Sequence, residues 1–525
     1  MLSIRLKRLL CLGTMLFMAS GCGFFKSEPT IAPFISATEI ALPVQASDLV
    51  YGECPFGLPD DATPEAMPEV RCATLTVPED WQKPDGSKIQ LAVAIVKTAS
   101  LEPKSDPLLV FIGNPGYGLF IAYALSFLFE DIFAQRDLII IDQRGTGFSK
   151  PALDCPELNS LSTLVNVNLS LQEANDLLVE ASNNCANKVK TSGVNLPFYT
   201  TAAEAADLEA LRQVLGISQW NIFSLVNGSQ LALTMMRDYP QSIRSVVMDS
   251  PTPLQANPAL EWGANAEMTF DRFFERCSED AGCVKAYPNL KETFLSLLDQ
   301  LDEEPIPIDV ANLSGGERNK VILDSERLIT LILRLLNTVN DRESLPEVPR
   351  MIYQLQAGKT EVAARLMGRY PDMLPGSAMQ QWIACNEELS FITQEQVSLA
   401  NENLNPHLRK YFNAQAQGSF RACEEWKAPG VPPIENQPVK SGIPTLLLAG
   451  EYDWSEPPSW AERTAQTLSQ STVVIFPGLG QVVYASSQWS VCSKQIVNAF
   501  LETPTAKPDI SCASIPFKET WITLP

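Results

Sequence analysis

The stretch Trp220-Asn-Ile-Phe-Ser-Leu-Val-Asn-Gly-Ser-Gln-Leu-Ala-Leu-Thr234 decides the fold of this chain. It opens with a short apolar run, which is typical of a buried strand. A corner with small residues at its two ends, Ser224 and Gly228, comes next, and the chain then continues as a segment rich in Leu, Ala and Met. This pattern predicts a strand, a tight turn and a helix in immediate succession.

Similar apolar runs recur along the chain and predict a sheet that is buried on both faces. They cover residues 108–112, 138–141, 221–223, 245–248, 445–449 and 472–476. Helical segments, such as 203–215 and 230–237, separate several of them. The alternation predicts a doubly wound α/β fold with a mostly parallel sheet, and residues 72–77 and 89–96 predict its antiparallel leading edge.

Three motifs, in this order, resemble those of a known family. Gly113-Asn-Pro-Gly116 follows a predicted strand, Asp142-Gln-Arg-Gly-Thr-Gly-Phe-Ser149 follows the next, and the turn at 224–228 leads into Leu231-Ala-Leu-Thr-Met-Met-Arg-Asp-Tyr-Pro240. Over most of residues 50–512 the chain resembles the α/β-hydrolase serine exopeptidases of the tripeptidyl-aminopeptidase and prolyl-aminopeptidase type. The resemblance implies an α/β-hydrolase fold with an inserted helical lid.

The family carries its catalytic serine at the centre of a G-x-S-x-G turn, followed in the chain by an acid and a histidine. Here Val226 stands in the place of the serine, Asp453 matches the acid, and Gln481 stands in the place of the histidine. Valine has no oxygen for attack on a carbonyl, and an amide does not accept a proton near neutral pH. Removal of either the nucleophile or the base lowers the turnover of a studied subtilisin about 10⁶-fold. We therefore expect no active catalytic residue at these three positions.

Other side chains are poor substitutes for the missing groups. Ser224 and Ser229 flank the turn, but they lie two residues before and three residues after the position of the nucleophile. A tight turn would aim both of them elsewhere. His407 is the only histidine, precedes Asp453 and has no motif around it, so we interpret it as a surface or helix-start residue.

Backbone N–H groups of Gly113, Asn114 and Asn227 match the family's oxyanion hole. Asn114 departs from the family, which has a second glycine there. Two interpretations stay open. These donors could still hold a carboxylate or a carbonyl, or the turns could persist only because the fold requires them.

Helical periodicity replaces the strand pattern between residues 254 and 440. The predicted helices cover residues 264–277, 290–301, 325–338, 345–357 and 361–368. The resemblance implies that this insertion is the lid. It also implies that Cys385-Asn-Glu-Glu388 supplies the carboxylate that meets the amino group of a substrate, which makes Glu387 and Glu388 candidate amine-binding residues. The simpler interpretation is that both are ordinary acids on a helix surface.

The N-terminal 22 residues predict a lipoprotein signal peptide. Arg5, Lys7 and Arg8 form its positive region, and residues 9–18 form a short apolar region. Ala19-Ser-Gly-Cys22 resembles a bacterial lipobox, in which the cysteine is lipidated. An ordinary signal peptide cleaved nearby is the alternative, and both interpretations predict export.

The rest of the chain divides into a tether and a folded part. No further stretch is apolar for long enough to span a membrane. The predicted parts are a tether at 23–47, the first part of the hydrolase core at 48–253, the lid insertion at 254–440 and the C-terminal part of the core at 441–525.

Cysteine usage agrees with export. Apart from Cys11 and Cys22 there are ten cysteines, and an even number in an exported chain is typical of disulfides. Short loops close at the lowest entropic cost, so neighbours in the sequence are predicted to pair. The expected disulfides are Cys54–Cys72, Cys155–Cys185, Cys277–Cys283, Cys385–Cys423 and Cys492–Cys512. The chain has no C-x-x-C and a single histidine, so we expect no metal site and no cofactor.

The charge of the chain limits its partners. The formal net charge is −22, and removal of the three signal-peptide cations makes it −25. Such a chain is not expected to bind nucleic acid or to adhere electrostatically to anionic lipid, which leaves an acyl group on Cys22 as the membrane attachment.

The leading functional hypothesis is an exported lipoprotein with a peptidase-like scaffold and an inactive triad. It would bind a peptide or a protein in the cleft under the lid. Two alternatives remain: an active serine-type aminopeptidase or esterase with a rearranged site, and a structural protein of the cell envelope.

Overall fold

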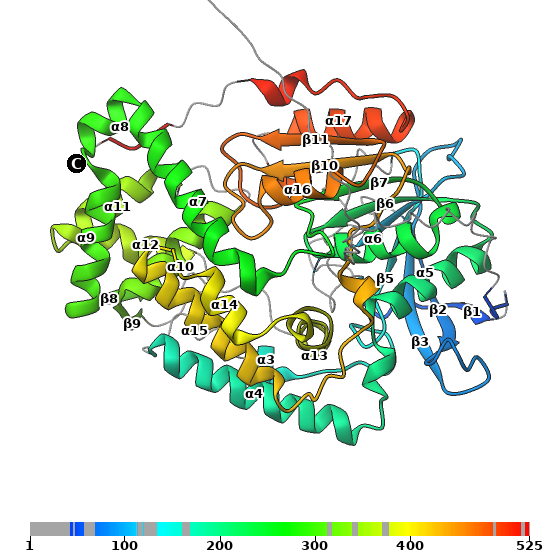
Figure 1. The fold of residues 1–525 in the computed structure, drawn as a ribbon. Helices are drawn as coiled ribbons and strands as arrows, with labels where there is room; N and C mark the ends of the chain where they lie inside the picture. The colour runs from blue at the N-terminus through cyan, green and yellow to red at the C-terminus, as the bar shows by residue number, and fades with distance from the viewer. Residues whose placement is uncertain are drawn as a thin grey trace, which may run out of the picture. The chain divides into compact units, whose positions relative to one another are not determined.

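A nine-stranded sheet lies at the centre of the fold, and most of its strands coincide with the apolar runs of the sequence (Figure 1). In spatial order they are β1 (Leu49–Gly52), β2 (Val70–Pro78), β3 (Lys88–Val96), β5 (Leu138–Ile141), β4 (Leu108–Phe111), β6 (Trp220–Leu225), β7 (Ile243–Asp249), β10 (Thr445–Gly450) and β11 (Ser471–Phe476). Strands β1, β2, β3 and β5 pair antiparallel, and all pairs from β5 to β11 are parallel. The predicted parallel sheet with an antiparallel leading edge is confirmed.

The computed structural model covers the folded part of the chain. The predicted signal peptide, most of the tether and Asn114 lie outside the described residues. The described residues are 42–45, 48–56, 69–111, 113, 119, 134–159, 169–311, 318–338, 345–369, 377–486, 490–515 and 520–523.

Helices cover both faces of the sheet. Helices α5 (Thr201–Leu215), α6 (Gly228–Asp238) and α16 (Pro458–Ala465) pack on one face, and α17 (Ser490–Glu502) packs on the other. Strand β4 shows why both faces are covered. Its successive side chains point to opposite faces of the sheet, and each face has its own hydrophobic cluster. Burial on both sides explains why these strands read as continuous apolar runs.

The insertion between β7 and β10 contains the predicted helices and several further elements. They are α7 (Pro258–Glu279), α8 (Ala281–Ala286), α9 (Leu290–Glu303), β8 (Ile306–Ala311), β9 (Arg318–Leu323), α10 (Ser325–Asn337), α11 (Val348–Gln356), α12 (Glu361–Arg369), α13 (Ala378–Ile383), the π-helix η8 (Ala384–Glu388), α14 (Gln394–Ala400) and α15 (Pro406–Cys423). The antiparallel hairpin β8–β9, helix α8 and the helices α13 to α15 were not among the predicted elements.

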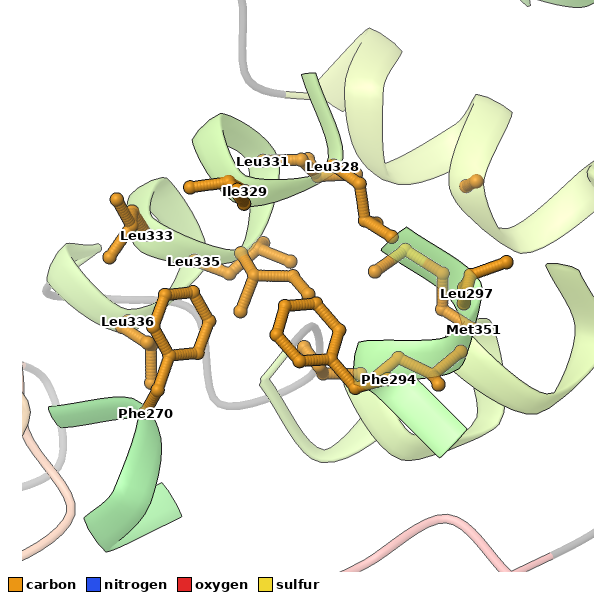
Figure 2. Close-up of a cluster of buried hydrophobic side chains, with 14 of the residues drawn as sticks. Phe270, Phe294, Leu297, Leu328, Ile329, Leu331, Leu333, Leu335, Leu336 and Met351 are labelled. Carbon is orange, nitrogen blue, oxygen red and sulfur yellow. The ribbon is translucent and has the colours of Figure 1, made fainter. Parts of the chain in front are cut away.

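This insertion has a hydrophobic core of its own. Phe270 from α7, Phe294 and Leu297 from α9, Leu328 from α10 and Met351 from α11 are at most 3% exposed and turn toward one another (Figure 2). Burial of side chains of this size contributes about 1.5–3 kcal/mol each. The insertion is therefore a packed substructure and not an extended loop.

Helix α4 (Leu171–Thr191) was also not predicted, although the sequence marks its start. The Ser170 hydroxyl accepts a hydrogen bond from the Glu173 N–H at 3.2 Å, and the Glu173 carboxylate accepts one from the Ser170 N–H at 2.7 Å. This capping box corresponds to the S-x-x-E pattern that precedes many helices. Helix α4 contacts the lid, since the Ser182 hydroxyl donates to the Ala422 carbonyl of α15 at 2.7 Å.

All five predicted disulfides are present. Their Cα–Cα distances lie between 5.0 and 5.8 Å, within the usual range. Disulfides of this number indicate an exported protein. Within the part of the chain that the structure describes, we find no helix with the length and apolar character needed to cross a membrane.

Candidate active site

Val226 forms the tip of the turn between β6 and α6. Its φ angle is 53°, in the left-handed region that β-branched residues rarely adopt. The Val226 N–H donates to the Asp249 carbonyl of β7 at 2.9 Å, and the Ser229 N–H and hydroxyl donate to the Val226 carbonyl at 3.1 and 2.6 Å. These bonds hold the residue in the strained conformation that presents a nucleophile above the sheet in a strand–turn–helix elbow. A partly exposed isopropyl group occupies that position.

The predicted oxyanion loop lies directly against this elbow. A Cβ atom on Gly113 would lie 2.7 Å from Asn227 Oδ1 and 2.9 Å from Val226 Cβ, so only glycine fits. The structure thus brings Gly113 and Asn227 together as expected, whereas Asn114 lies outside the described residues. Asn227 Oδ1 is buried and has no hydrogen-bond partner in the described structure.

The two serines beside the elbow are fully engaged elsewhere. The Ser224 hydroxyl is buried and donates to the Val247 carbonyl at 3.4 Å. The Ser229 hydroxyl contacts the Val226 and Thr252 carbonyls and accepts from the Thr252 N–H at 2.8 Å. Neither is presented to the site, as predicted from their spacing.

Asp453 lies in the loop after β10, where the sequence places the acid. Its Oδ1 atom accepts hydrogen bonds from the Glu456 N–H at 2.9 Å and from the Ser455 hydroxyl at 3.1 Å. Its Oδ2 atom is buried and has no hydrogen-bond partner in the described structure. In a working triad, the free oxygen of this acid accepts the N–H of the histidine.

Gln481 lies beside the same loop but does not reach Asp453. Its side-chain Nε2 donates to Glu456 Oε2 at 2.5 Å and to the Ser455 hydroxyl at 3.1 Å. The loop of Gln481 also touches β7, because the Val482 N–H donates to the Ser250 hydroxyl at 2.9 Å. Val226, Asp453 and Gln481 follow strands β6, β10 and β11, and the carboxyl ends of these parallel strands lie at the same edge of the sheet.

Buried carboxyl groups gather around these positions. Burial raises the pKa of Asp453, and burial together with the charge of Asp453 raises the pKa of Glu456. Asp249 accepts hydrogen bonds from the Val483 and Tyr484 N–H groups, yet burial still raises its pKa to about 7. The site can therefore hold protons on carboxyl groups near neutral pH, but it contains no imidazole.

Glu387 and Glu388 come from the π-helix of the lid and line a cavity of about 20 Å³. Glu387 accepts a hydrogen bond from the Thr201 N–H at the start of α5, at 3.0 Å. Burial raises the pKa of each of the two carboxyls to about 7. Both residues are partly buried.

Comparison with known proteins agrees with the geometry of the elbow. Residues 106–486, well over half of the chain, match the family described as the alpha/beta hydrolase fold. The chain belongs to the α/β-hydrolase family.

Named relatives of this α/β-hydrolase include peptidases. It is 24% identical to the putative hydrolase YuaR of Escherichia coli over 505 residues, which is 92% of this chain and 96% of YuaR. It is 26% identical to the serine protease Hip1 of Mycobacterium tuberculosis over 48% of this chain and 52% of Hip1. It is 27% identical to the tripeptidyl aminopeptidase of Streptomyces lividans over 34% of this chain and 35% of that enzyme.

Solved structures of other α/β-hydrolases are similar in fold. A proline iminopeptidase from Mycobacterium smegmatis matches with a TM-score of 0.36 and 13% identity, over 82% of this chain and 98% of that one. A thermophilic esterase from Thermogutta terrifontis matches with a TM-score of 0.34 and 14% identity, over 80% and 95%.

Three residues of this α/β-hydrolase site were not predicted. Ser455 and Glu456 follow Asp453 on the same loop, and Asn337 at the end of lid helix α10 donates to the Ser455 hydroxyl at 2.7 Å. The only signal for Glu456 was a second acid three residues after Asp453. His407 lies away from these groups, near the start of α15, where its ring contacts Asp299 and Asp302 at 2.9 and 3.1 Å.

Proposed function

We propose that this protein is an exported, lipid-anchored α/β-hydrolase that binds peptides or proteins through a free amino group and does not hydrolyse them. The observation that carries the proposal is Val226 at the tip of the elbow, with its φ of 53°. The tight turn after β6, the positive φ at its tip and the helix that follows support an elbow in which valine replaces the nucleophile. A valine side chain cannot form an acyl-enzyme.

The position of the general base supports the same conclusion. The Gln481 amide is bound to Glu456 and Ser455, and an amide does not take up a proton near neutral pH. Loss of a nucleophile or a base costs about 10⁶ in turnover, which corresponds to about 8 kcal/mol of transition-state stabilisation. An enzyme that lacks both the nucleophile and the base keeps only the small rate enhancement that substrate binding and the oxyanion donors provide.

The cavity at the π-helix supports an amine as the recognised group. Its three acids are Glu387, Glu388 and Glu435, and Glu435 is already paired with Arg237 at 2.8 Å. The Glu388 carboxylate has no ion pair among the described residues. An ammonium group would supply charge and hydrogen-bond donors to this half-buried carboxylate. The tripeptidyl aminopeptidase among the relatives is named for action at a peptide amino terminus, which agrees with such a site.

The size of the cavity indicates how a ligand would enter. About 20 Å³ is room for one water-sized group, which is also the size of an ammonium. A peptide chain behind that ammonium needs further space. Binding of a peptide therefore requires the lid to move relative to the sheet.

Export and anchoring rest on the N-terminal sequence. Cys22 after Ala19-Ser-Gly would carry the acyl group, and residues 23–47 would tether the folded part to a membrane surface. The five disulfides fit an oxidising compartment. Mass spectrometry of the mature N-terminus tests this part, and an unmodified residue other than Cys22 at the N-terminus would contradict it.

Peptide binding can be tested with a matched pair of ligands. A tripeptide with a free amino group should stabilise the protein in a thermal-shift titration, whereas the same peptide with an acetylated amino group should not. A ligand at 100 times its Kd adds about 2.7 kcal/mol to the free energy of unfolding. Glu388→Gln should abolish the difference, and Glu435→Gln, which changes an already paired acid in the same cavity, should reduce it less. Equal binding of both peptides would contradict the proposal.

A further inference from the structure

Several contacts fasten the lid to the hydrolase core, including the ion pairs Glu261–Arg463 and Arg272–Glu451. A further contact is made by Asn337, which ends helix α10. Its side-chain Nδ2 donates to the Ser455 hydroxyl at 2.7 Å, and its Oδ1 accepts from the Trp454 N–H at 3.3 Å. Its backbone carbonyl accepts from the Gln481 N–H at 3.2 Å. One lid residue therefore binds both loops that hold the remains of the triad.

Neighbouring contacts make this junction tight. A Cβ atom on Gly480 would lie 2.3 Å from the Leu336 carbonyl of α10, so the two backbones touch. The Trp454 indole N–H donates to the Leu333 carbonyl of α10 at 2.9 Å, and the Trp262 indole N–H from α7 donates to the Ser455 carbonyl at 3.1 Å. These contacts all converge on the loop that carries Asp453.

Beneath this junction, one hydroxyl group lies between two carboxyl groups. The Ser455 Oγ atom is 2.5 Å from Glu456 Oε2 and 3.1 Å from Asp453 Oδ1. It already accepts hydrogen bonds from the amides of Asn337 and Gln481, and it has a single hydrogen to donate. Both of its acceptor positions are thus occupied, and it can donate to only one of the two carboxyl groups, so the other carboxyl receives no hydrogen bond from Ser455.

The surroundings of the pair contain no compensating cation among the groups that contact it. Asp249 at the end of β7 and Glu388 from the lid face it, and both are acids. The other groups that contact the pair are uncharged: the Gln481 amide, the Ser455 hydroxyl and the backbone N–H of Glu456. The Ser250 side chain also acts to lower the pKa of Asp453. Two ionised carboxylates in such a place repel each other and their neighbours.

We propose that Asp453, Ser455 and Glu456 form a pH-sensitive latch, which holds the lid closed while the carboxyl pair keeps a proton and releases it when both carboxyls ionise. The latch regulates access to the cavity of Glu387 and Glu388, and in that respect it rests on the proposed function. It reuses the site of the former catalytic acid and base as a conformational switch.

The direction of the pH dependence follows from linkage. Burial, and for Glu456 also the charge of Asp453, raises the pKa of each carboxyl in the closed state above its ordinary value. In an opened lid, water would reach the pair and return the pKa toward the ordinary range of 4–4.5. The closed state therefore binds more protons, and its stability relative to the open state is greatest at acidic pH and falls as pH rises through the raised pKa values.

Hydrogen exchange at the two reporter amides, Trp454 and Gln481, tests the latch in the full-length mature protein. Their protection factors, which are corrected for the intrinsic rate at each pH, should fall about tenfold or more between pH 6 and pH 9. Amides of the central strand β6 should stay unchanged over the same range. Protection that is independent of pH at Trp454 and Gln481 would overturn the proposal.

Isosteric variants identify the responsible groups. Glu456→Gln and Asp453→Asn should each flatten the pH dependence at both reporter amides. The matched control is Glu451→Gln on the same loop, which breaks ion pairs to Arg272 and Arg276 of α7 but leaves the pair untouched. It should weaken protection at all pH values and keep the slope. An unchanged slope in both isosteric variants would also overturn the latch.

The same experiment separates the latch from the proposed function. If the protection factors depend on pH but the protein shows no preference for free-amino peptides, the latch is supported and the peptide-binding function is contradicted. If the protein prefers free-amino peptides but the protection factors do not change with pH, the peptide-binding function is supported and the latch is contradicted.

Discussion

The side-chain amide of Gln481 donates a hydrogen bond to Glu456 Oε2 at 2.5 Å. The residue in the position of the catalytic base is therefore bound to an acid that the sequence comparison with the family did not single out. Asp453, which should orient that base, is left with a buried and unpartnered Oδ2 atom. The Gln481 side chain is thus bound to Glu456 and Ser455, and a histidine at this position would have to break with that arrangement.

Restoring the two missing groups should restore weak chemistry. Val226→Ser together with Gln481→His should react covalently with a fluorophosphonate, because the hydroxyl regains a base and Asp453 Oδ2 can accept the imidazole N–H. Intact-mass spectrometry measures the adduct. Gln481→His alone should give none, since it has no nucleophile. A folded double variant that stays unlabelled would show that the cleft has lost more than its triad.

The strain at the elbow should be measurable. Val226→Gly removes a β-branched side chain from the left-handed region, where such a side chain costs about 1–2 kcal/mol. The valine is partly buried and packs against a hydrophobic cluster, so lost burial offsets part of this gain and the free energy of unfolding should rise by about 1 kcal/mol or less. Val246→Gly, in the buried strand β7, should lower it by several kcal/mol and serves as the control. Denaturant unfolding measures both, and destabilisation by Val226→Gly would contradict the account of strain.

The disulfide Cys385–Cys423, which lies beside Glu387 and Glu388 in the sequence, should stabilise the protein more than Cys277–Cys283 does. Cys385–Cys423 closes a loop of 38 residues and Cys277–Cys283 closes one of 6. Loop-closure entropy gives losses of about 4 and about 2 kcal/mol when each pair is changed to serine. Only the first change should also weaken binding of free-amino peptides, because it loosens the π-helix with Glu387 and Glu388. Equal effects of the two changes on binding would contradict that link.

Binding of an ammonium ligand should depend on pH in a defined direction. Burial places the pKa of Glu387 and Glu388 at about 7, so binding must first displace protons below that pH. Affinity should rise from pH 5.5 to about 7 and fall again as the ligand's α-amino group loses its proton near pH 8. Calorimetric titration in the Glu456→Gln background removes the contribution of the latch. An affinity that is constant over this range would exclude these two acids as the ligand's partners.

The fold could be predicted because its determinants are local. Strand β5 matches its predicted bounds of 138–141, since a strand buried on both faces leaves a continuous apolar run. The hairpin β8–β9 was missed, although β8 alternates between buried and exposed residues, because the helical pattern around it dominated the interpretation. Helix α4 does carry a local signal, the S-x-x-E capping pattern that begins at Ser170.

The site could be predicted only in part. Val226, Asp453 and Gln481 follow recognisable strands, so sequence alone indicated their positions. The latch could not be predicted in the same way, since Asn337 lies more than a hundred residues before Ser455 and meets it only because α10 packs on that loop. Contacts that depend on how the insertion docks leave no local pattern in the sequence.

Treatment of the wild-type protein with a fluorophosphonate, followed by assay on tripeptidyl and aminoacyl chromogenic amides, measures the central claim most directly. An active tripeptidyl aminopeptidase assayed in parallel provides the positive control. The account predicts no covalent adduct and no turnover above that of Val226→Ala. The account would be contradicted if a serine of this chain formed an adduct and both the wild-type protein and the Val226→Ala variant hydrolysed the substrates.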